Sequence, residues 1–227
     1  MNINTLKKFE GDIRSSVPDF SVKWKDSSRA QRVLGTSMFF NRKYMTGYVT
    51  TFYPRVYFPS EKSYEKNPAS SFIVLAHERV HLMDAALYKW WFRLSYLLPQ
   101  ILVLPALLAS LLCLVVKYYA FSLVFFGLGV VAALPWASPF RVQWEKRGYA
   151  MTMAANYWLY GSIPDKMKQE IRSNFLGWSY YKMSRDPADI DAWIAKTVAD
   201  IEGGRICTDP VYDEVHRFLL AEGLTHQ

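Results

Sequence analysis

The sequence predicts an α+β fold, with a small sheet followed by helices and interrupted by a transmembrane helical hairpin. Three observations predict it. Residues 36–59 are rich in aromatic and β-branched residues, which is typical of strands. Start signals and apolar spacing predict a helix over residues 69–90 and further helices from residue 142 onward. Two uncharged apolar runs, 94–116 and 118–139, each exceed the roughly 20 residues that cross a bilayer as a helix.

Composition limits the partners of the chain. It has 227 residues, 51% of them hydrophobic, which is enough to bury a core. Its net charge of +7 suits an anionic membrane or a nucleic acid, but no basic block favours nucleic acid, so we expect a lipid bilayer as partner and no nucleic acid. Cys113 lies in an apolar run and Cys207 in a polar loop, so we expect no disulfide and a reducing compartment. Residues 1–12 lack the apolar core of a signal peptide.

The amino-terminal third precedes the main motif and forms the sheet. A short strand is expected at residues 20–24 and a helix at 27–33, with no chemistry assigned to either. Further strands are expected at 38–40, 48–53 and 55–58. If the last two form an exposed edge, that edge would bind an extended substrate by strand addition; otherwise they are core strands.

The five-residue pattern H-E-x-x-H begins at His77, within the helix predicted over residues 69–90. Residues four apart lie on one face of a helix, so His77 and His81 can present two imidazoles to one Zn²⁺ ion. A third protein ligand would complete the site and leave a position for a water molecule that the metal acidifies. Glu78 is then placed to accept the proton of that water.

The two apolar runs predict a hairpin whose ends lie on the cytoplasmic side. Only Lys117 separates the runs, whereas the flanking segments carry five basic residues, and basic residues mark the cytoplasmic side. Beyond the hairpin, helices are expected over residues 142–160, 162–182, 186–202 and 209–223. The chain is thus divided into the sheet and motif helix (1–93), the hairpin (94–140) and a helical part (141–227), with the first and last completing one catalytic domain.

The helix that follows the hairpin supplies the expected third ligand, Glu145. The hairpin returns this helix to the membrane face from which the motif helix entered. From His81 to Trp90 is about 14 Å at 1.5 Å per residue, so the metal would lie close to the bilayer surface. The alternatives for the third ligand are Asp84, Glu170 and His216.

These residues resemble the gluzincins, zinc metallopeptidases that have H-E-x-x-H on one helix and a glutamate ligand on a later one. The nearest likeness is to membrane metallopeptidases of the heat-shock-protease and CAAX-prenyl-protease type, whose second motif reads roughly E-x-x-A-D. The resemblance covers residues 36–160 at most. It implies a zincin-like fold, with His77, His81 and Glu145 as zinc ligands and Glu78 as general base.

The chain departs from that second motif, because it has Gly148 and then Tyr149 where the family has alanine and aspartate. The second motif therefore does not identify the group that orients a ligand imidazole, and Asp84 is one candidate. Stabilisation of the developing oxyanion requires a hydrogen-bond donor, for which Tyr149 and His216 are candidates.

The expected function is a zinc-dependent metalloendopeptidase, a hydrolase anchored by the hairpin, with both termini and the active site in the cytoplasm. Its substrates would be peptide or protein segments close to the membrane, the inner membrane if the chain is bacterial or phage-encoded. The alternative is a catalytically inactive, membrane-anchored interaction protein on the same framework. An intact Glu78 argues against this alternative, because structural zinc does not need it.

Overall fold

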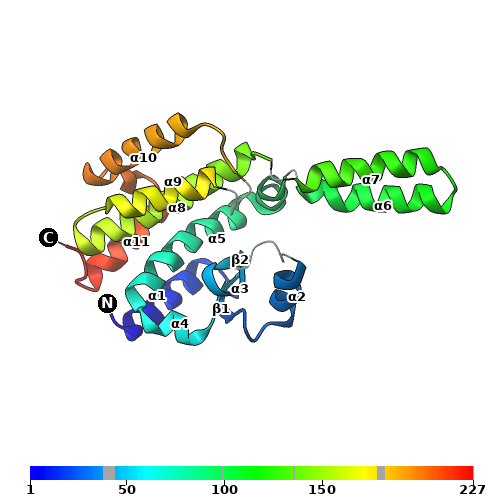
Figure 1. Ribbon diagram of the computed structural model, residues 1–227. Helices are drawn as coiled ribbons and strands as arrows, with labels where there is room; N and C mark the ends of the chain where they lie inside the picture. Colours follow the sequence, from blue (N-terminus) through cyan, green and yellow to red (C-terminus); the bar gives the residue numbers. More distant parts are fainter. Residues whose placement is uncertain (38–43, 99, 135, 178–181, 227) are drawn as a thin grey trace.

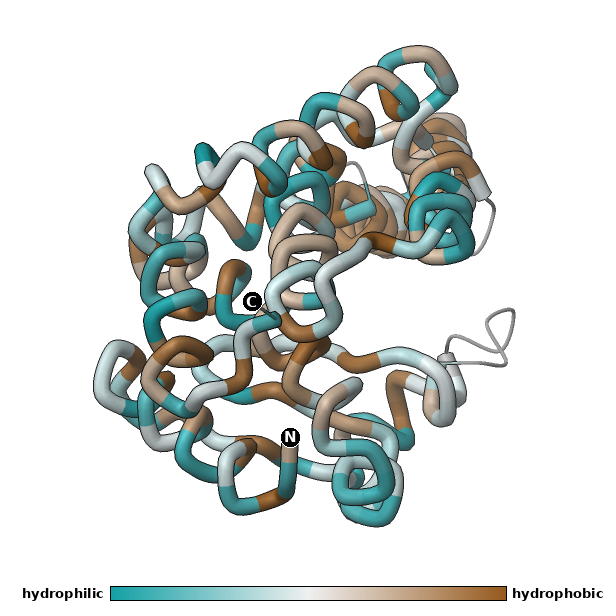
Figure 2. The backbone as a smooth tube through the Cα atoms, turned by 90° about the vertical axis from the view of Figure 1, so that its left-hand side faces the viewer, coloured by the Kyte–Doolittle hydropathy of each residue, from teal (hydrophilic) through white to brown (hydrophobic). Residues whose placement is uncertain are grey.

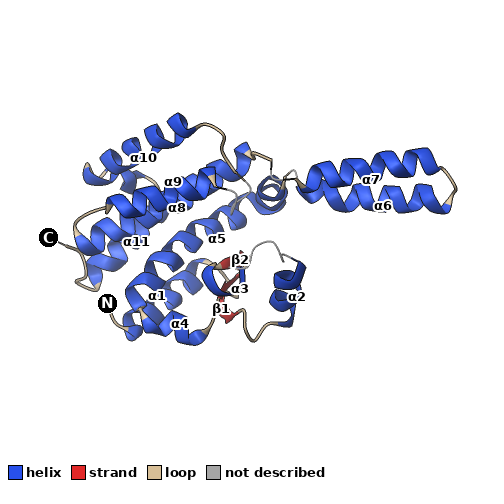
Figure 3. Cartoon of the chain, in the orientation of Figure 1, coloured by secondary structure: helices blue, strands red, loops and turns tan. Residues whose placement is uncertain are grey.

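The computed structural model describes residues 1–37, 44–98, 100–134, 136–177 and 182–226. Within these ranges the chain is mostly helical, with one small sheet, so the α+β prediction is confirmed at this level (Figures 1 and 3). The strand expected at 38–40 lies outside the described residues. In chain order the elements are α1 (Ile3–Ser16), β1 (Ser21–Trp24), α2 (Arg29–Ser37), α3 (Tyr44–Gly47), β2 (Thr50–Phe52), β3 (Arg55–Phe58), α4 (Glu61–Lys66), α5 (Pro68–Leu97), η1 (Gln100–Leu102), α6 (Val103–Val115), α7 (Tyr119–Ala133), α8 (Pro139–Tyr160), α9 (Asp165–Leu176), α10 (Pro187–Glu202), η3 (Arg205–Thr208) and α11 (Pro210–Ala221).

The three described strands pair in the order β1-β3-β2, and all three were predicted from the sequence. β2 runs antiparallel to β3 with Thr50 opposite Tyr57, and a two-residue turn joins them. β1 runs parallel to β3 with Val22 opposite Val56. β2 therefore forms one edge of the sheet, and this edge lies beside α5 (Figure 3).

The long helices α5 and α8 pack along each other and form the centre of the molecule (Figure 1). α1 and α4 pack on α5, while α9 and α10 lie against α8, and α11 contacts both central helices. In most helices of this body hydrophilic and hydrophobic residues recur along the chain, as expected for helices with one buried face (Figure 2). Both termini lie at the end of the body away from the hairpin (Figures 1 and 2).

No helix is predicted from the sequence at residues 3–16, yet α1 forms there. Asn2 caps it, since its side-chain oxygen accepts a hydrogen bond from the Thr5 amide at 3.0 Å. Leu6, Phe9 and Ile13 are fully buried at helical spacing. The charged residues between them hide this short apolar stripe in the sequence.

The motif helix is confirmed, but it contains a break. Its first turn is capped by Asn67, whose side-chain oxygen accepts from the Ser70 amide at 3.1 Å, and Pro68 takes the first helical position. Lys89 has φ 50° and ψ −119°, which is outside the helical region and strained for a residue with a side chain. We call the part of α5 after this break, residues 90–97, the linking helix; in Figure 1 it is seen nearly end-on at the base of the hairpin.

α6 and α7 form the predicted hairpin, which projects from the body (Figure 1). The Ser110 hydroxyl donates to the Ser122 carbonyl at 2.9 Å and joins the two helices at a buried position. At Gly129 an added Cβ would lie 3.2 Å from Leu107 Cδ2, so the missing side chain allows close packing. Outward-facing positions are apolar and exposed, among them Leu111 at 57%.

The helices of this hairpin are shorter than the predicted runs 94–116 and 118–139. α6 has 13 residues and α7 has 15, so each is about 20–22 Å long against a hydrocarbon core of about 30 Å. Prolines follow Leu98 and Leu134, and a residue before proline is driven out of the helical region; both residues are extended. Among the described residues no single helix is both long and apolar enough to cross a membrane; α5 and the segment Gln100–Val115 qualify only as a pair, bent by 78°.

The carboxy-terminal part is helical, as predicted. Asp186 and Asp209 cap α10 and α11 by accepting hydrogen bonds from first-turn amides, and a proline takes the first helical position of each. α9 ends at Leu176, earlier than the predicted residue 182, because Gly177 is extended.

We expect Phe72→Ala to reduce the free energy of unfolding by about 3–5 kcal/mol, because truncating a fully buried ring leaves a cavity. Phe72 is 0% exposed, and its ring centroid lies 4.5 Å from that of Phe9 and 6.0 Å from that of Phe218, so it joins three helices. Urea unfolding of the detergent-purified protein measures this loss. Leu220→Ala, on the exposed side of α11, serves as control and should change the value by less than about 0.5 kcal/mol. Equal effects of the two changes would contradict this account of the core.

Candidate metal centre

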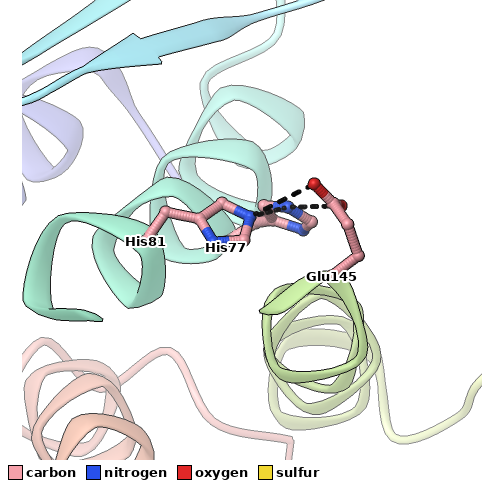
Figure 4. A group of neighbouring side chains, drawn as sticks. All are labelled: His77, His81 and Glu145. Carbon is pink, nitrogen blue, oxygen red and sulfur yellow. Dashed lines mark hydrogen bonds and ion pairs between the residues drawn. The ribbon is translucent and has the colours of Figure 1, made fainter. Parts of the chain in front are cut away.

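α5 and α8 bring together His77, His81 and Glu145, the three ligands expected from the sequence (Figure 4). The two Nε2 atoms lie 3.1 Å apart. Oε2 of Glu145 lies 3.7 Å from His77 Nε2, and Oε1 lies 3.7 Å from His81 Nε2. All three donor atoms fall within 4.8 Å of one another. The hydrophobic packing of α5 against α8 therefore assembles one polar cluster from residues that lie far apart in the sequence.

The cluster suits a metal ion in both donor type and spacing. Two imidazoles and one carboxylate are the protein ligands of many catalytic zinc sites. Around a tetrahedral ion with bonds of about 2.0–2.2 Å, donor atoms lie about 3.3 Å apart. The observed separations of 3.1 and 3.7 Å lie on either side of that value. These residues could therefore hold a divalent ion such as zinc.

Both histidines are neutral at physiological pH, which is the form that binds a metal. Burial lowers the pKa of His77 to about 3, and the neighbouring His81 adds to this effect. Burial lowers the pKa of His81 to about 4, with Arg147 acting in the same direction. The imidazole nitrogens are thus available without the loss of a proton.

Thr152 orients His77. His77 Nδ1 lies 3.0 Å from Thr152 Oγ1, and the Thr152 hydroxyl lies 3.3 Å from the Gly148 carbonyl, to which it donates. The hydroxyl then accepts from Nδ1–H, and this tautomer leaves Nε2 of His77 free to bind a metal. Sequence analysis missed this role, although Glu145, Gly148 and Thr152 are spaced i, i+3 and i+7 and so share one face of α8.

Gly148 provides the space for the His77 ring. An added Cβ would lie 2.6 Å from His77 Nε2, closer than non-bonded atoms approach. A residue without a side chain is therefore needed where α8 passes the His77 ring.

Aromatic rings from the linking helix enclose His81. The ring centroids of Phe92 and Tyr96 each lie 6.1 Å from that of His81. Within the described part of the chain, His81 Nδ1 is buried without a hydrogen-bond partner. Packing rather than a hydrogen bond therefore orients this imidazole.

Glu145 accepts a hydrogen bond from the hydroxyl of Tyr96 at Oε1. Tyr96 lies within the run predicted to begin a membrane span at residue 94, so nothing in the sequence pattern pointed to a role here. Because it contacts Glu145, the linking helix belongs to the candidate site and not to the hairpin.

Glu78 lies beside the ligands, as a general base would. Its Oε2 accepts a hydrogen bond from Thr51 Oγ1 of β2 at 2.6 Å. Burial raises the pKa of Glu78 to about 7, whereas the Thr51 hydrogen bond and the charge of Lys25 act to lower it. A carboxylate with a pKa near neutrality suits proton transfer at physiological pH.

Lys25, to which the sequence assigned no chemistry, is a buried cation close enough to interact with Glu78 electrostatically. Its ammonium donates to the Tyr44 carbonyl at 2.8 Å and lies 3.9 Å from the centre of the Tyr44 ring. Burial lowers the pKa of Lys25 to about 8, and Glu78 opposes that shift. A single lysine after a short strand carries no pattern by which sequence analysis could have found it.

The proposed orienting role of Asp84 is not supported. Its carboxylate accepts from Arg147 Nε at 3.3 Å, and Arg147 also donates to Asp209 at 2.9 Å. This network links α5, α8 and the start of α11 behind the ligands. The ligand-orienting acceptor is instead Thr152.

The two expected oxyanion donors lie at different distances from the site. The Tyr149 ring lies edge-on to His77, with ring centroids 4.9 Å apart, and its hydroxyl accepts from Asn174 at 2.9 Å. His216 stacks on Trp158 with centroids 4.7 Å apart, and Trp158 is about 20 Å along α8 from Glu145. The expectation for His216 is therefore not supported, either as oxyanion donor or as metal ligand, because α11 places it at the far end of α8.

Glu170, the remaining ligand alternative, is exposed beside Lys166.

We expect Gly148→Ala to remove bound zinc while leaving the fold intact, because the new methyl group displaces the His77 ring. Elemental analysis of the purified protein measures zinc per chain. The control is Gly11→Ala, also within a helix, where an added Cβ meets nothing within 4 Å. This control should retain the zinc of the wild type. Full zinc content in Gly148→Ala would show that the ring does not need this space.

Comparison with known proteins identified no relative of this chain. No protein-family model, no curated protein and no solved structure matches the chain.

Proposed function

We propose that this protein is a zinc-dependent metalloendopeptidase that acts at a membrane surface. The observation that carries the proposal is the group of partly buried His77 with buried His81 and Glu145, together with the buried carboxylate of Glu78 next to His77 in the sequence. A structural metal site needs only ligands, whereas hydrolysis also needs a base next to them. This combination favours the enzyme over the inactive interaction protein.

When bound, a zinc ion supplies an acidified water molecule and polarises the substrate carbonyl. The chain itself provides the proton transfer. Glu78 accepts a proton at its carboxylate and returns it to the amine that leaves the cleaved peptide bond. Thr51 holds Oε2 of Glu78 by a hydrogen bond, so the carboxylate is fixed before substrate binds.

The edge strand β2 supports a peptide as substrate. Its outer edge is unpaired among the described strands, and Thr51 within it contacts the proposed base. An extended peptide that adds to this edge would run past Glu78 with its backbone held by main-chain hydrogen bonds. Such binding favours unfolded segments over folded proteins, because only extended backbone can pair with a strand.

The apolar hairpin supports a location at the membrane. Its exposed surface is aliphatic and aromatic, and a surface of this kind is rare on a protein surrounded by water. Lys117, Tyr118 and Tyr119 lie at its tip, while Trp90 and Trp91 are exposed at its base. Aromatic residues of this kind favour the interfaces of a bilayer. Substrates would then be segments close to the membrane, cut on the cytoplasmic side.

We expect Glu78→Gln to lower kcat/KM for peptide hydrolysis by about 10²–10⁴-fold, because the amide cannot accept the proton. Zinc content should stay at the wild-type level, since Glu78 is not among the ligands. The assay uses fluorescently labelled unfolded casein, and Glu61→Gln, at an exposed position of α4, is the control. Wild-type rates in Glu78→Gln would refute the mechanism, and zinc-bound wild type without hydrolysis would favour the interaction protein.

Leu111→Arg should weaken binding to phospholipid vesicles, since a charged residue at the centre of an inserted helix costs about 2.5–3.5 kcal/mol. Vesicle flotation measures the bound fraction. Leu220→Arg is a matched control, because Leu220 is 52% exposed and Leu111 is 57% exposed, but Leu220 lies on α11 of the body. If both variants float as the wild type does, the hairpin is not the membrane anchor.

A further inference from the structure

We infer that Tyr96 is a positioning residue of this site, whose hydroxyl fixes Glu145 as the third metal ligand. The inference rests on the proposed metal centre and goes beyond the ligands themselves. It assigns to the linking helix a role in metal binding, so that the segment between the motif helix and the hairpin becomes part of the centre.

The contact is specific to one oxygen of the carboxylate. The Tyr96 hydroxyl donates to Oε1 of Glu145, the oxygen that lies 3.7 Å from His81 Nε2. Oε2, by contrast, lies 3.7 Å from His77 Nε2 and accepts nothing from Tyr96. A glutamate side chain has several rotatable bonds, and holding it in one orientation reduces the entropy that metal binding would otherwise cost. A hydrogen bond to a ligand carboxylate also fixes its direction, and the loss of such a bond typically costs 10–100-fold in metal affinity.

Tyr96 is itself held in place by α8. Arg141 Nε donates to the Tyr96 carbonyl at 2.9 Å, and Arg141 also donates to the Gln100 side chain at 3.0 Å. One residue before Tyr96, the fully buried Ser95 hydroxyl accepts from Trp144 Nε1 at 3.0 Å. Two donors that precede Glu145 on α8 thus dock the linking helix onto the helix that carries Glu145.

The backbone break is what allows this docking. A continuous helix would carry residues 90–97 straight on along the axis of α5. The positive φ at Lys89 turns the chain, so that residues 92 and 96 approach His81 while the chain continues into the hairpin. A break at a residue with a side chain is unfavourable, so the contacts of the linking helix must compensate for it.

Metal binding and docking of the linking helix are therefore coupled. If docked Tyr96 strengthens metal binding, then a bound metal strengthens docking by the same factor, since linkage is reciprocal. The hairpin continues directly from this helix, so a metal at the centre would also order the connection to the hairpin.

The test compares two tyrosines that each donate to a buried carboxylate. Tyr96→Phe removes the hydroxyl at Glu145, whereas Tyr64→Phe removes the hydroxyl that donates to Glu10 at 2.9 Å, far from the ligands. Zinc affinity is measured by competition with a fluorescent chelator, with His77→Ala as the reference for loss of a ligand. We expect a 10–100-fold weaker affinity in Tyr96→Phe and an unchanged affinity in Tyr64→Phe.

Hydrogen exchange of the backbone amides in residues 92–97 provides a second measurement. Zinc should slow their exchange in the wild type and in Tyr64→Phe, but less in Tyr96→Phe at saturating zinc. A general loss of stability would not produce this difference, because Tyr64→Phe destabilises the fold in the same manner.

The outcomes separate this inference from the proposed function. Wild-type affinity in Tyr96→Phe, together with weak binding in His77→Ala, would overturn the role of Tyr96 and leave the metal centre standing. Equal weakening in Tyr96→Phe and Tyr64→Phe would also overturn it, because the effect would then follow stability. Absence of zinc binding by the wild type would overturn both proposals.

Discussion

The packing of α5 against α8 is the contact on which the site depends. His77 and His81 come from one helix and Glu145 from the other, so the three donors meet only if the two helices approach closely. Gly148 permits that approach, because any larger side chain would occupy the space of the His77 ring. The hydrophobic contacts that stabilise the body therefore also determine the distance between the proposed metal ligands.

Burial also determines the protonation states of the two histidines and of Glu78. Removing charged groups from water favours neutral forms, so it lowers the pKa of both histidines and raises that of Glu78. The same surroundings thus provide two neutral imidazoles and a carboxylate whose pKa lies near neutrality. Thr51 and Lys25 act against the shift at Glu78, and both come from the amino-terminal part of the chain. The small sheet therefore contributes to the chemistry as well as to the core.

The linking helix joins two parts of the molecule with different surroundings. On one side it contacts ligands in a buried polar centre; on the other it leads into a hairpin with an exposed apolar surface. The strained conformation at Lys89 and the prolines at positions 99 and 135 end helices where a simple hydropathy reading would continue them. These breaks redirect the chain from the helical body into the apolar hairpin.

The sequence by itself determined the elements and chemistry that depend on local pattern. The spacing of His77, Glu78 and His81 predicted one helix face, capping residues predicted the carboxy-terminal helices, and the apolar runs predicted the hairpin. Glu145 was expected beside the histidines because the hairpin had to return α8 to α5, and the structure places it within 4.8 Å of both imidazole donor atoms. Only the tertiary structure decided which groups support these residues. Thr51, Lys25 and Tyr96 carry no distinctive spacing, and Thr152 shares only a helix face with Glu145; each acts through a contact that forms when separate elements pack. Likewise α11 placed His216 away from the ligands, because packing and not residue type fixes where a side chain lies.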